Sequence, residues 1–143
     1  MVGDGPDKKK AKDYLRKNNL KNRVIFLGKT NEVDEILCSS DLFLLPSEKE
    51  SFGLAALEAM ALKVPVISTN TGGLKELNIN GNSGYTSEIG DIDSMASNSI
   101  KILSDKSLKK KYRSQAFENA KKYDINKIIP LYENIYDEAI KIY

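Results

Sequence analysis

Two glutamates eight residues apart, Glu50 and Glu58, flank a short stretch of chain that could bind an anion with hydroxyl-bearing groups on either side. Each carboxylate can accept two hydrogen bonds, so both suit neighbouring hydroxyls. The first N–H groups of a helix between them would favour an anion, because they lack intrahelical partners and the helix dipole is positive there. We expect these donors at about residues 51–54, where Gly53 lets a ligand approach the backbone.

The order carboxylate, anion site, carboxylate fits a diphosphate with a hydroxyl-bearing group on either side, which is the shape of a nucleotide sugar. The spacing alone leaves a plainer interpretation open, in which Glu50 lies near a helix N-cap and Glu58 on a solvated face. A glycosidase pair is not supported, because those enzymes place both carboxyl groups about 5–10 Å apart around one bond. On a helix, eight residues rise by about 12 Å.

A strand, a loop and a helix must position these groups. Residues 41–45 are an apolar run short enough for a buried strand, and Pro46 ends it by removing a backbone donor. A polar loop follows at 47–51, and then a helix with apolar positions from Phe52 to Met60. In an open parallel sheet, ligands bind at the carboxyl ends of the strands, so this loop lies where a site is expected.

The context of the two glutamates resembles the family 4 retaining glycosyltransferases, which have the two-domain GT-B fold. Residues 47–61 spell S-x-x-E-S-F-G-L-x-x-L-E-A-M-A around the E-x7-E pair, and residues 3–6, 24–28, 64–76, 81–85 and 90–91 are also similar to that family. The resemblance covers nearly the whole chain. It implies the C-terminal half of a GT-B enzyme: an α/β fold with a Rossmann-like parallel sheet flanked by helices and a C-terminal helical extension.

The resemblance implies a role for each residue of the site. Glu50 would be catalytic, holding sugar hydroxyls and orienting the anomeric carbon, and Glu58 would hold the ribose hydroxyls. Backbone N–H groups would stabilise the departing diphosphate, and two positions in an earlier loop would meet the nucleotide base through their backbones. Together with Glu58, the donor-binding positions are Ser51, Phe52, Gly53, Leu54, Gly28 and Thr30.

Residues 47–54 and 128–133 are most similar to those family members that move N-acetylglucosamine from UDP-N-acetylglucosamine to L-malate, with retention, in bacillithiol biosynthesis. Other members, which act on capsule, polysaccharide or lipid-linked sugars, stay open as alternatives, as does a non-catalytic nucleotide-binding remnant. The Arg and Lys that neutralise the diphosphate in this family would lie upstream of Met1. We therefore expect this chain to be inactive alone, with the acceptor bound mainly by a missing N-terminal domain.

Composition excludes several other functions. The chain has 143 residues, a formal charge of +2 and no histidine, so nucleic-acid binding and His-based catalysis are not indicated. Cys38 is the only cysteine, and we expect it to be a small buried side chain. No apolar run is long enough for a transmembrane helix, and the start is not a signal peptide, which favours a cytoplasmic protein. The UDP-sugar is a substrate, no cofactor or metal is expected, and a homo-oligomer is left open.

Two domains are expected: residues 1–123 as a nucleotide-sugar-binding Rossmann-like domain truncated at its N-terminus, and 124–143 as a helix that crosses to the missing N-terminal domain. That helix is rich in apolar side chains and ends at Tyr143. Residues 72–73 are expected either as a tight turn or as a wall of the donor site. The other expected elements are helices at 7–18, 32–39, 92–103 and 107–122 and strands at 23–27, 64–69 and 84–86.

Overall fold

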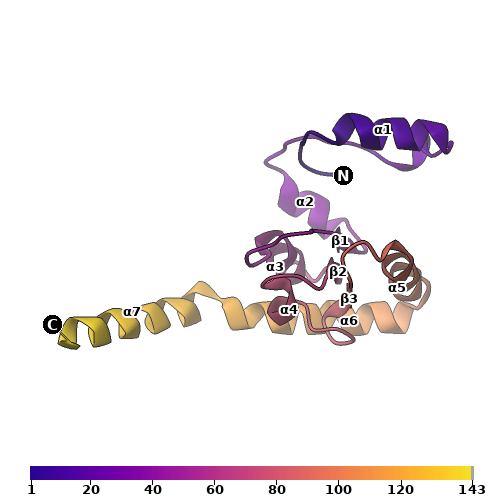
Figure 1. Ribbon diagram of the computed structural model, residues 1–143. Coiled ribbons are helices and arrows are strands. Elements are labelled where there is room, and N and C mark those ends of the chain that lie inside the picture. Colours follow the sequence, from indigo (N-terminus) through magenta and orange to yellow (C-terminus); the bar gives the residue numbers. More distant parts are fainter. Residues whose placement is uncertain (143) are drawn as a thin grey trace. The chain divides into compact units, whose positions relative to one another are not determined.

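The computed structural model describes residues 1–142, and Tyr143 lies outside the described residues. The chain forms two compact units, Met1–Ile36 and Leu37–Tyr143, and each is described by itself. Figure 1 shows helices around a small sheet in the second unit. Within residues 1–142, no helix is long and apolar enough to cross a membrane.

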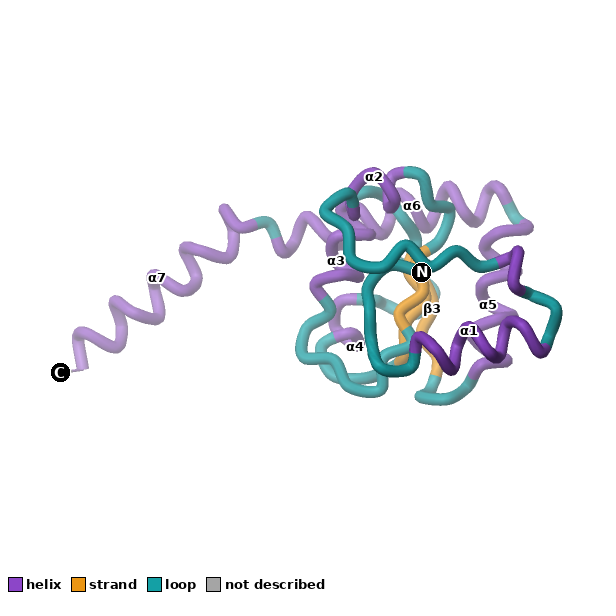
Figure 2. The backbone as a smooth tube through the Cα atoms, turned by 90° about the horizontal axis from the view of Figure 1, so that it is seen from above, coloured by secondary structure: helices purple, strands orange, loops and turns teal. Residues whose placement is uncertain are grey.

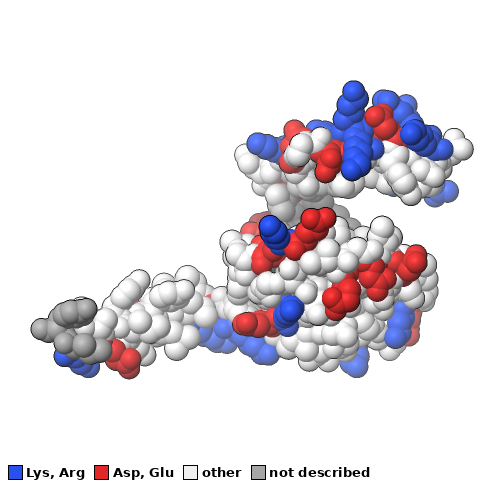
Figure 3. Space-filling model, viewed as in Figure 1, with Lys and Arg blue, Asp and Glu red and all other residues white. Residues whose placement is uncertain are grey.

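Unit 1 contains helix α1 (Lys8–Lys17), a 3-10 turn η1 (Lys21–Arg23) and the first part of α2 (Val33–Cys38). Lysine and arginine side chains gather over α1, as Figure 3 shows. None of the residues of α1 is buried, and its ion pairs are short-range, such as Lys8 with Asp4 at 3.3 Å. Exposed pairs of this kind contribute little to stability.

The strand expected at 23–27 is not formed, which corrects the sequence-based prediction. Residues 21–23 make η1 instead, and the following extended segment pairs only with the chain start, through a parallel bridge between Val2 and Gly28. The N–H of Gly3 donates to the Gly28 carbonyl at 2.7 Å. Parallel strands are normally buried on both faces, but Ile25 is 72% exposed. This apolar run, which is not covered on both faces, therefore forms only a bridge.

Unit 2 is built on a parallel three-stranded sheet in the order β1-β2-β3, with β1 (Phe43–Leu45), β2 (Val66–Thr69) and β3 (Gly84–Ser87). Phe43 pairs with Val66, and Val66 pairs with Gly84. Helix α3 (Leu54–Ala61) connects β1 to β2, and α4 (Leu74–Leu77) connects β2 to β3. This α/β architecture with a parallel sheet flanked by helices confirms the predicted fold class.

Helices flank the sheet on both sides. Figures 1 and 2 show α3 and α4 on one side of the strands and α5 (Ile92–Ser104) on the other. Helix α6 (Lys106–Ala120) packs against both α3 and α5. Its Lys109 forms an ion pair with Asp41 at 2.8 Å. Helices α5 and α6 both start and end close to the bounds expected from the sequence, 92–103 and 107–122.

The core lies around β2, whose four residues are all buried. Beside α5 and α6 it contains Ile67, Ile102 and Tyr112, and α3 and α4 supply a second group of buried side chains: Ala56, Ala59, Met60, Leu74 and Leu77. The burial of all four β2 residues confirms the buried strand expected at 64–69, although Ser68 and Thr69 at its carboxyl end are polar.

Cys38 is exposed, and this also corrects an expectation. The buried residue of α2 is its neighbour Leu37, at 5% exposure. Consecutive residues on a helix point about 100° apart, so a short helix that buries Leu37 turns the next side chain away. The apolar character of a thiol does not outweigh that geometry.

The last segments are a 3-10 turn η2 (Lys121–Tyr123) and helix α7 (Ile125–Ile142), which contains Pro130. Figures 1 and 2 show α7 extending away from the sheet and the helices around it. Apolar side chains along it are exposed, for example Ile135 at 60% and Ile140 at 73%. The sequence predicted a helix with an apolar surplus here, and both features are present.

Candidate functional site

The site loop, residues 46–53, leads from the carboxyl end of β1 to the start of α3. Its last residue, Gly53, is the N-cap of α3 and has φ = 94°, a conformation that favours glycine. A side-chain carbon placed on Gly53 would lie 2.5 Å from Cδ2 of Leu74. Two separate reasons, the positive φ and the close contact, therefore require glycine where the chain enters the helix.

Helix α3 begins at Leu54, later than the sequence suggested. The N–H groups of Ala56 and Leu57 already bond back to the Gly53 carbonyl, at 2.9 and 3.0 Å. The first-turn donors without an intrahelical partner are therefore those of Leu54 and Ala55. The positive φ of Gly53 stops the helix from extending backward, so the expected donors at 51 and 52 belong to the loop and not to the first turn.

A second loop after β2, the glycine loop at residues 70–73, lies directly on the backbone of the site loop. The N–H of Gly73 donates to the Ser51 carbonyl at 3.1 Å. A side-chain carbon on Gly72 would lie 1.7 Å from the carbonyl oxygen of Glu50, and one on Gly73 would lie 2.6 Å from that of Ser51. The glycine loop is thus a close support for the backbone that carries Glu50, and any side chain there would push the two loops apart.

Two threonines that the sequence analysis did not single out add to this support. The Thr69 hydroxyl donates to the Ser47 carbonyl, and the Thr71 hydroxyl donates to the Glu48 carbonyl at 3.3 Å. The available signal was their place at and just after the carboxyl end of β2. The three strand ends are linked further by the N–H of Asn70, which donates to the carbonyl of Ser87 at 2.8 Å.

The two glutamates differ in exposure. Glu50 is half-buried in the site loop, whereas Glu58 is exposed on α3, on the side away from the buried Ala59 and Met60. Among residues 1–142, neither carboxylate forms an ion pair or a side-chain hydrogen bond. Their oxygens are therefore available to accept hydrogen bonds from a ligand.

The strand ends also border a cavity of about 230 Å³. It lies where an open parallel sheet binds ligands, at the carboxyl ends of β1, β2 and β3. Mostly apolar side chains surround it, with one carboxylate, and its lining residues are Pro46, Glu48, Thr69, Ile89, Gly90, Ile92 and Met95. The cavity places open space on the Glu48 side of the site loop.

Gly28 and Thr30 lie in unit 1, whereas the other six site residues predicted from the sequence share one segment of unit 2. Gly28 has φ = 74° and pairs with Val2. The Thr30 hydroxyl accepts from the N–H of Glu32 at 3.1 Å, just before α2. This bond uses one lone pair of the hydroxyl, and its O–H donor is not used by it.

Metal ligands are not clustered in the described part of the chain. Within residues 1–142, no three or more cysteine, aspartate or glutamate side chains lie where they could hold a metal ion, and the sequence has no histidine. The expectation that sugar transfer by this protein needs no metal stays a prediction.

The sequence profile of the family described as "Glycosyl transferases group 1" matches residues 1–123. The chain is 41% identical over 142 residues to N-acetyl-alpha-D-glucosaminyl L-malate synthase of Bacillus anthracis, covering 99% of this chain and 37% of that protein. It is 32% identical to 2-deoxystreptamine N-acetyl-D-glucosaminyltransferase of Niallia circulans, covering 95% and 36%. The chain therefore spans well under half the length of these relatives.

Among solved structures, the chain is similar to HepE of Anabaena in complex with UDP-glucose. The TM-score is 0.85 at 25% identity, and the match covers 98% of this chain and 40% of that protein. The arrangement of site loop, glycine loop and α3 thus occurs in a fold that binds a nucleotide sugar in that relative.

Proposed function

Because this chain belongs to the glycosyl transferases group 1 family, we propose that it forms the donor-binding part of a retaining glycosyltransferase. One observation carries the proposal: Glu50, the unpartnered N–H groups of Leu54 and Ala55, and Glu58 follow one another on a single braced segment. A donor bound along that segment would meet a carboxylate, an anion site and a second carboxylate in turn.

The start of α3 supplies the electrostatic part. A diphosphate placed there would accept hydrogen bonds from free N–H groups and would lie at the positive end of the helix dipole. These donors would stabilise the charge that develops on the departing diphosphate, which is where preorganised donors contribute most to catalysis. Gly53 adds no side chain between the ligand and the backbone, so the phosphate oxygens can come close.

The carboxylates would select the groups on either side. Glu58 lies four residues after Leu54, a rise of about 6 Å on a helix, which suits ribose hydroxyls attached to a diphosphate at the helix start. Glu50 precedes the N-cap and would hold hydroxyls of the transferred sugar, orienting the anomeric carbon for the incoming acceptor. Neither carboxylate needs to form a covalent bond with the sugar.

We propose UDP-N-acetylglucosamine as the donor and the hydroxyl of L-malate as the acceptor. The B. anthracis relative is named for this malate reaction, and the N. circulans relative is also named for moving an N-acetylglucosaminyl group. The second relative is named for a different acceptor, 2-deoxystreptamine, so the acceptor is the less constrained half of the proposal. A cytoplasmic location follows from these intracellular substrates.

Acceptor binding and the second wall of the active site would come from a further domain, so the 143 residues would bind donor without transferring sugar. We propose that residues 1–123 are the donor domain and that α7 crosses to that further domain. The exposed apolar side chains along α7, such as Ile135 and Ile140, support this because they lack cover in unit 2. The relatives are more than twice as long as this chain, which is consistent with it.

Titration calorimetry with nucleotides tests the donor proposal. The chain is expected to bind UDP and UDP-N-acetylglucosamine more tightly than ADP or GDP. A protein that contains this chain and has the length of its relatives is then assayed with UDP-N-acetylglucosamine and L-malate. Release of UDP that depends on malate supports the acceptor assignment. Transfer to 2-deoxystreptamine or to a lipid-linked sugar, with no malate-dependent turnover, would replace it.

A further inference from the structure

The ring of Phe52 connects the site loop to the joint that precedes α7. Phe52 is half-buried, and its ring meets the ring of Tyr123 edge-on, with centroids 5.4 Å apart and planes at 70°. Edge-on aromatic pairs of this geometry are favourable beyond the area they bury. Phe52 immediately precedes the Gly53 N-cap, so this contact acts one residue from the start of the proposed anion site.

Tyr123 also reaches the support of the site loop from the other side. Its hydroxyl donates a long hydrogen bond, 3.5 Å, to the Glu76 carbonyl in α4. The residue before α4, Gly73, donates to the Ser51 carbonyl of the site loop. One side chain therefore contacts both the site loop and the helix that follows the glycine loop.

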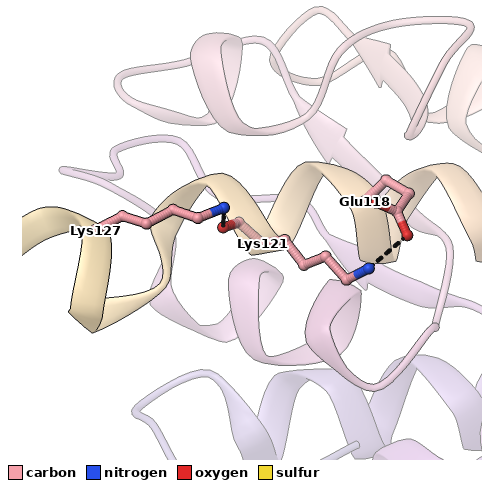
Figure 4. A network of polar contacts seen from close by, with 3 residues as sticks. All are labelled: Glu118, Lys121 and Lys127. Carbon is pink, nitrogen blue, oxygen red and sulfur yellow. Dashed lines mark hydrogen bonds and ion pairs between the residues drawn. The ribbon is translucent and has the colours of Figure 1, made fainter.

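The joint that carries Tyr123 is held by its own polar contacts, which Figure 4 shows. Lys121 forms an ion pair with Glu118 of α6 at 2.8 Å, and the Lys127 ammonium donates to the Lys121 carbonyl at 2.8 Å. Asp124 then accepts from the N–H of Asn126 at the start of α7. The joint thus fixes Tyr123 relative to the end of α6 and the first turn of α7.

We propose that Tyr123 is a positioning residue for the donor site. It holds the Phe52 ring, and through it the backbone N–H groups at 53–55, in the orientation that receives a diphosphate. Because α7 begins two residues after Tyr123, a change in the direction of α7 reaches the anion site through this one ring pair. The proposal rests on the proposed donor function for its ligand, but the ring contact itself does not.

The test uses the full 143-residue chain with Tyr123→Leu, Tyr123→Phe and, as a matched control, Tyr132→Leu. Tyr132 is an exposed tyrosine of α7 for which no ring contact is found within residues 1–142. Titration with UDP is expected to give about two- to tenfold weaker binding for Tyr123→Leu, the factor that corresponds to an edge-on aromatic pair. Tyr123→Phe keeps the ring and should stay within about twofold of the parent.

A double-mutant cycle separates positioning from a general loss of stability. If Tyr123 acts through Phe52, adding Tyr123→Leu to Phe52→Leu should weaken UDP binding no further. Multiplying effects in the double variant would overturn the proposal, as would equal losses in Tyr123→Leu and Tyr132→Leu.

Hydrogen exchange without ligand separates this inference from the donor function. The hydrogen-bonded amides of Ala56, Leu57 and Gly73, which donate to the carbonyls of Gly53 and Ser51, are expected to exchange at least about threefold faster in Tyr123→Leu than in the parent, with no change in Tyr132→Leu, because local opening follows lost packing. If the parent chain fails to bind UDP, the donor function falls, and the exchange comparison alone still supports or overturns the role of Tyr123. Unchanged exchange at Ala56, Leu57 and Gly73 overturns it.

Discussion

Replacing Gly72 with alanine should damage both the stability of unit 2 and its donor site, because the added carbon would lie 1.7 Å from the Glu50 carbonyl oxygen. Gly72 also has φ = 49°, a left-handed conformation that costs alanine about 1–2 kcal/mol. Relieving the overlap by moving the two loops apart should cost about 1–3 kcal/mol more. We therefore expect Gly72→Ala to lower the free energy of unfolding by roughly 2–5 kcal/mol.

Gly81→Ala is a matched control for the conformational part of that loss. Gly81 has φ = 75°, but nothing lies within 4 Å of the position its side-chain carbon would take. It belongs to the same unit as Gly72, so both variants report on the same cooperative structure. Only the conformational cost, about 1–2 kcal/mol, should appear in Gly81→Ala.

Urea unfolding followed by circular dichroism measures the difference between these two variants, and UDP titration of the folded variants measures the effect on the site. UDP binding should be weakened in Gly72→Ala and unchanged in Gly81→Ala. Equal unfolding free energies for the two variants, together with equal UDP affinities, would refute the close approach of the glycine loop to the Glu50 backbone.

Three further predictions concern the carboxylates, a surface ion pair and a buried amide. Glu58→Ala should weaken UDP binding by about tenfold or more, because it removes hydrogen bonds to a charged group. Glu50→Ala should keep the affinity for UDP and lose the preference for the UDP-sugar over UDP. Both variants are titrated with both ligands, and an unchanged UDP affinity in Glu58→Ala would discard the role given to Glu58. The hydrogen bond and the charge of Lys109 lower the pKa of Asp41 below its usual 3.8, so the stabilisation is present above pH 3.8 and is lost as the pH falls through the lowered value. Asp41→Asn should therefore flatten the acid side of the curve of stability against pH in denaturation scans, and an unchanged acid limb would contradict the pair. Asn78, which is 1% exposed, donates to Ser68 and to two carbonyls and accepts from Ser83. Asn78→Ala should lower the free energy of unfolding in urea by about 2–4 kcal/mol, because it leaves buried polar groups unpaired. A loss below about 1 kcal/mol would show that these groups are not buried.

The sequence predicted the strand, loop and helix around Glu50 because each has a strong local signal. The apolar run at 41–45, Pro46 and the apolar positions of the helix agree with one another, and local agreement of this kind is reliable. The helix start was less well placed. Its position depends on the positive φ of Gly53, and the sequence shows only that glycine permits such a conformation, not that the chain adopts it.

Features that depend on contacts distant in sequence could not be predicted. The supports from Thr69 and Thr71 join loops more than 20 residues apart, and a threonine at a strand end has no signal that names its partner. The expected strand at 23–27 carried a correct local pattern but found only the bridge to Val2, because strands depend on neighbours. Cys38 followed the rotation of its helix and not the average burial of its residue type.

The hydrogen bonds from Thr69, Thr71 and the N–H of Gly73 to the site loop all end on main-chain carbonyls, those of Ser47, Glu48 and Ser51. A side-chain carbon on Gly72 would also meet a main-chain carbonyl, that of Glu50. The side chains at 48, 49 and 51 take no part in these contacts, so they can be exchanged without removing what holds the backbone. This separation makes the loop an adaptable scaffold in evolution. A library randomised at Lys49 and Ser51, with the threonines and glycines kept, should yield folded variants that explore new donor sugars while Glu50 stays in place.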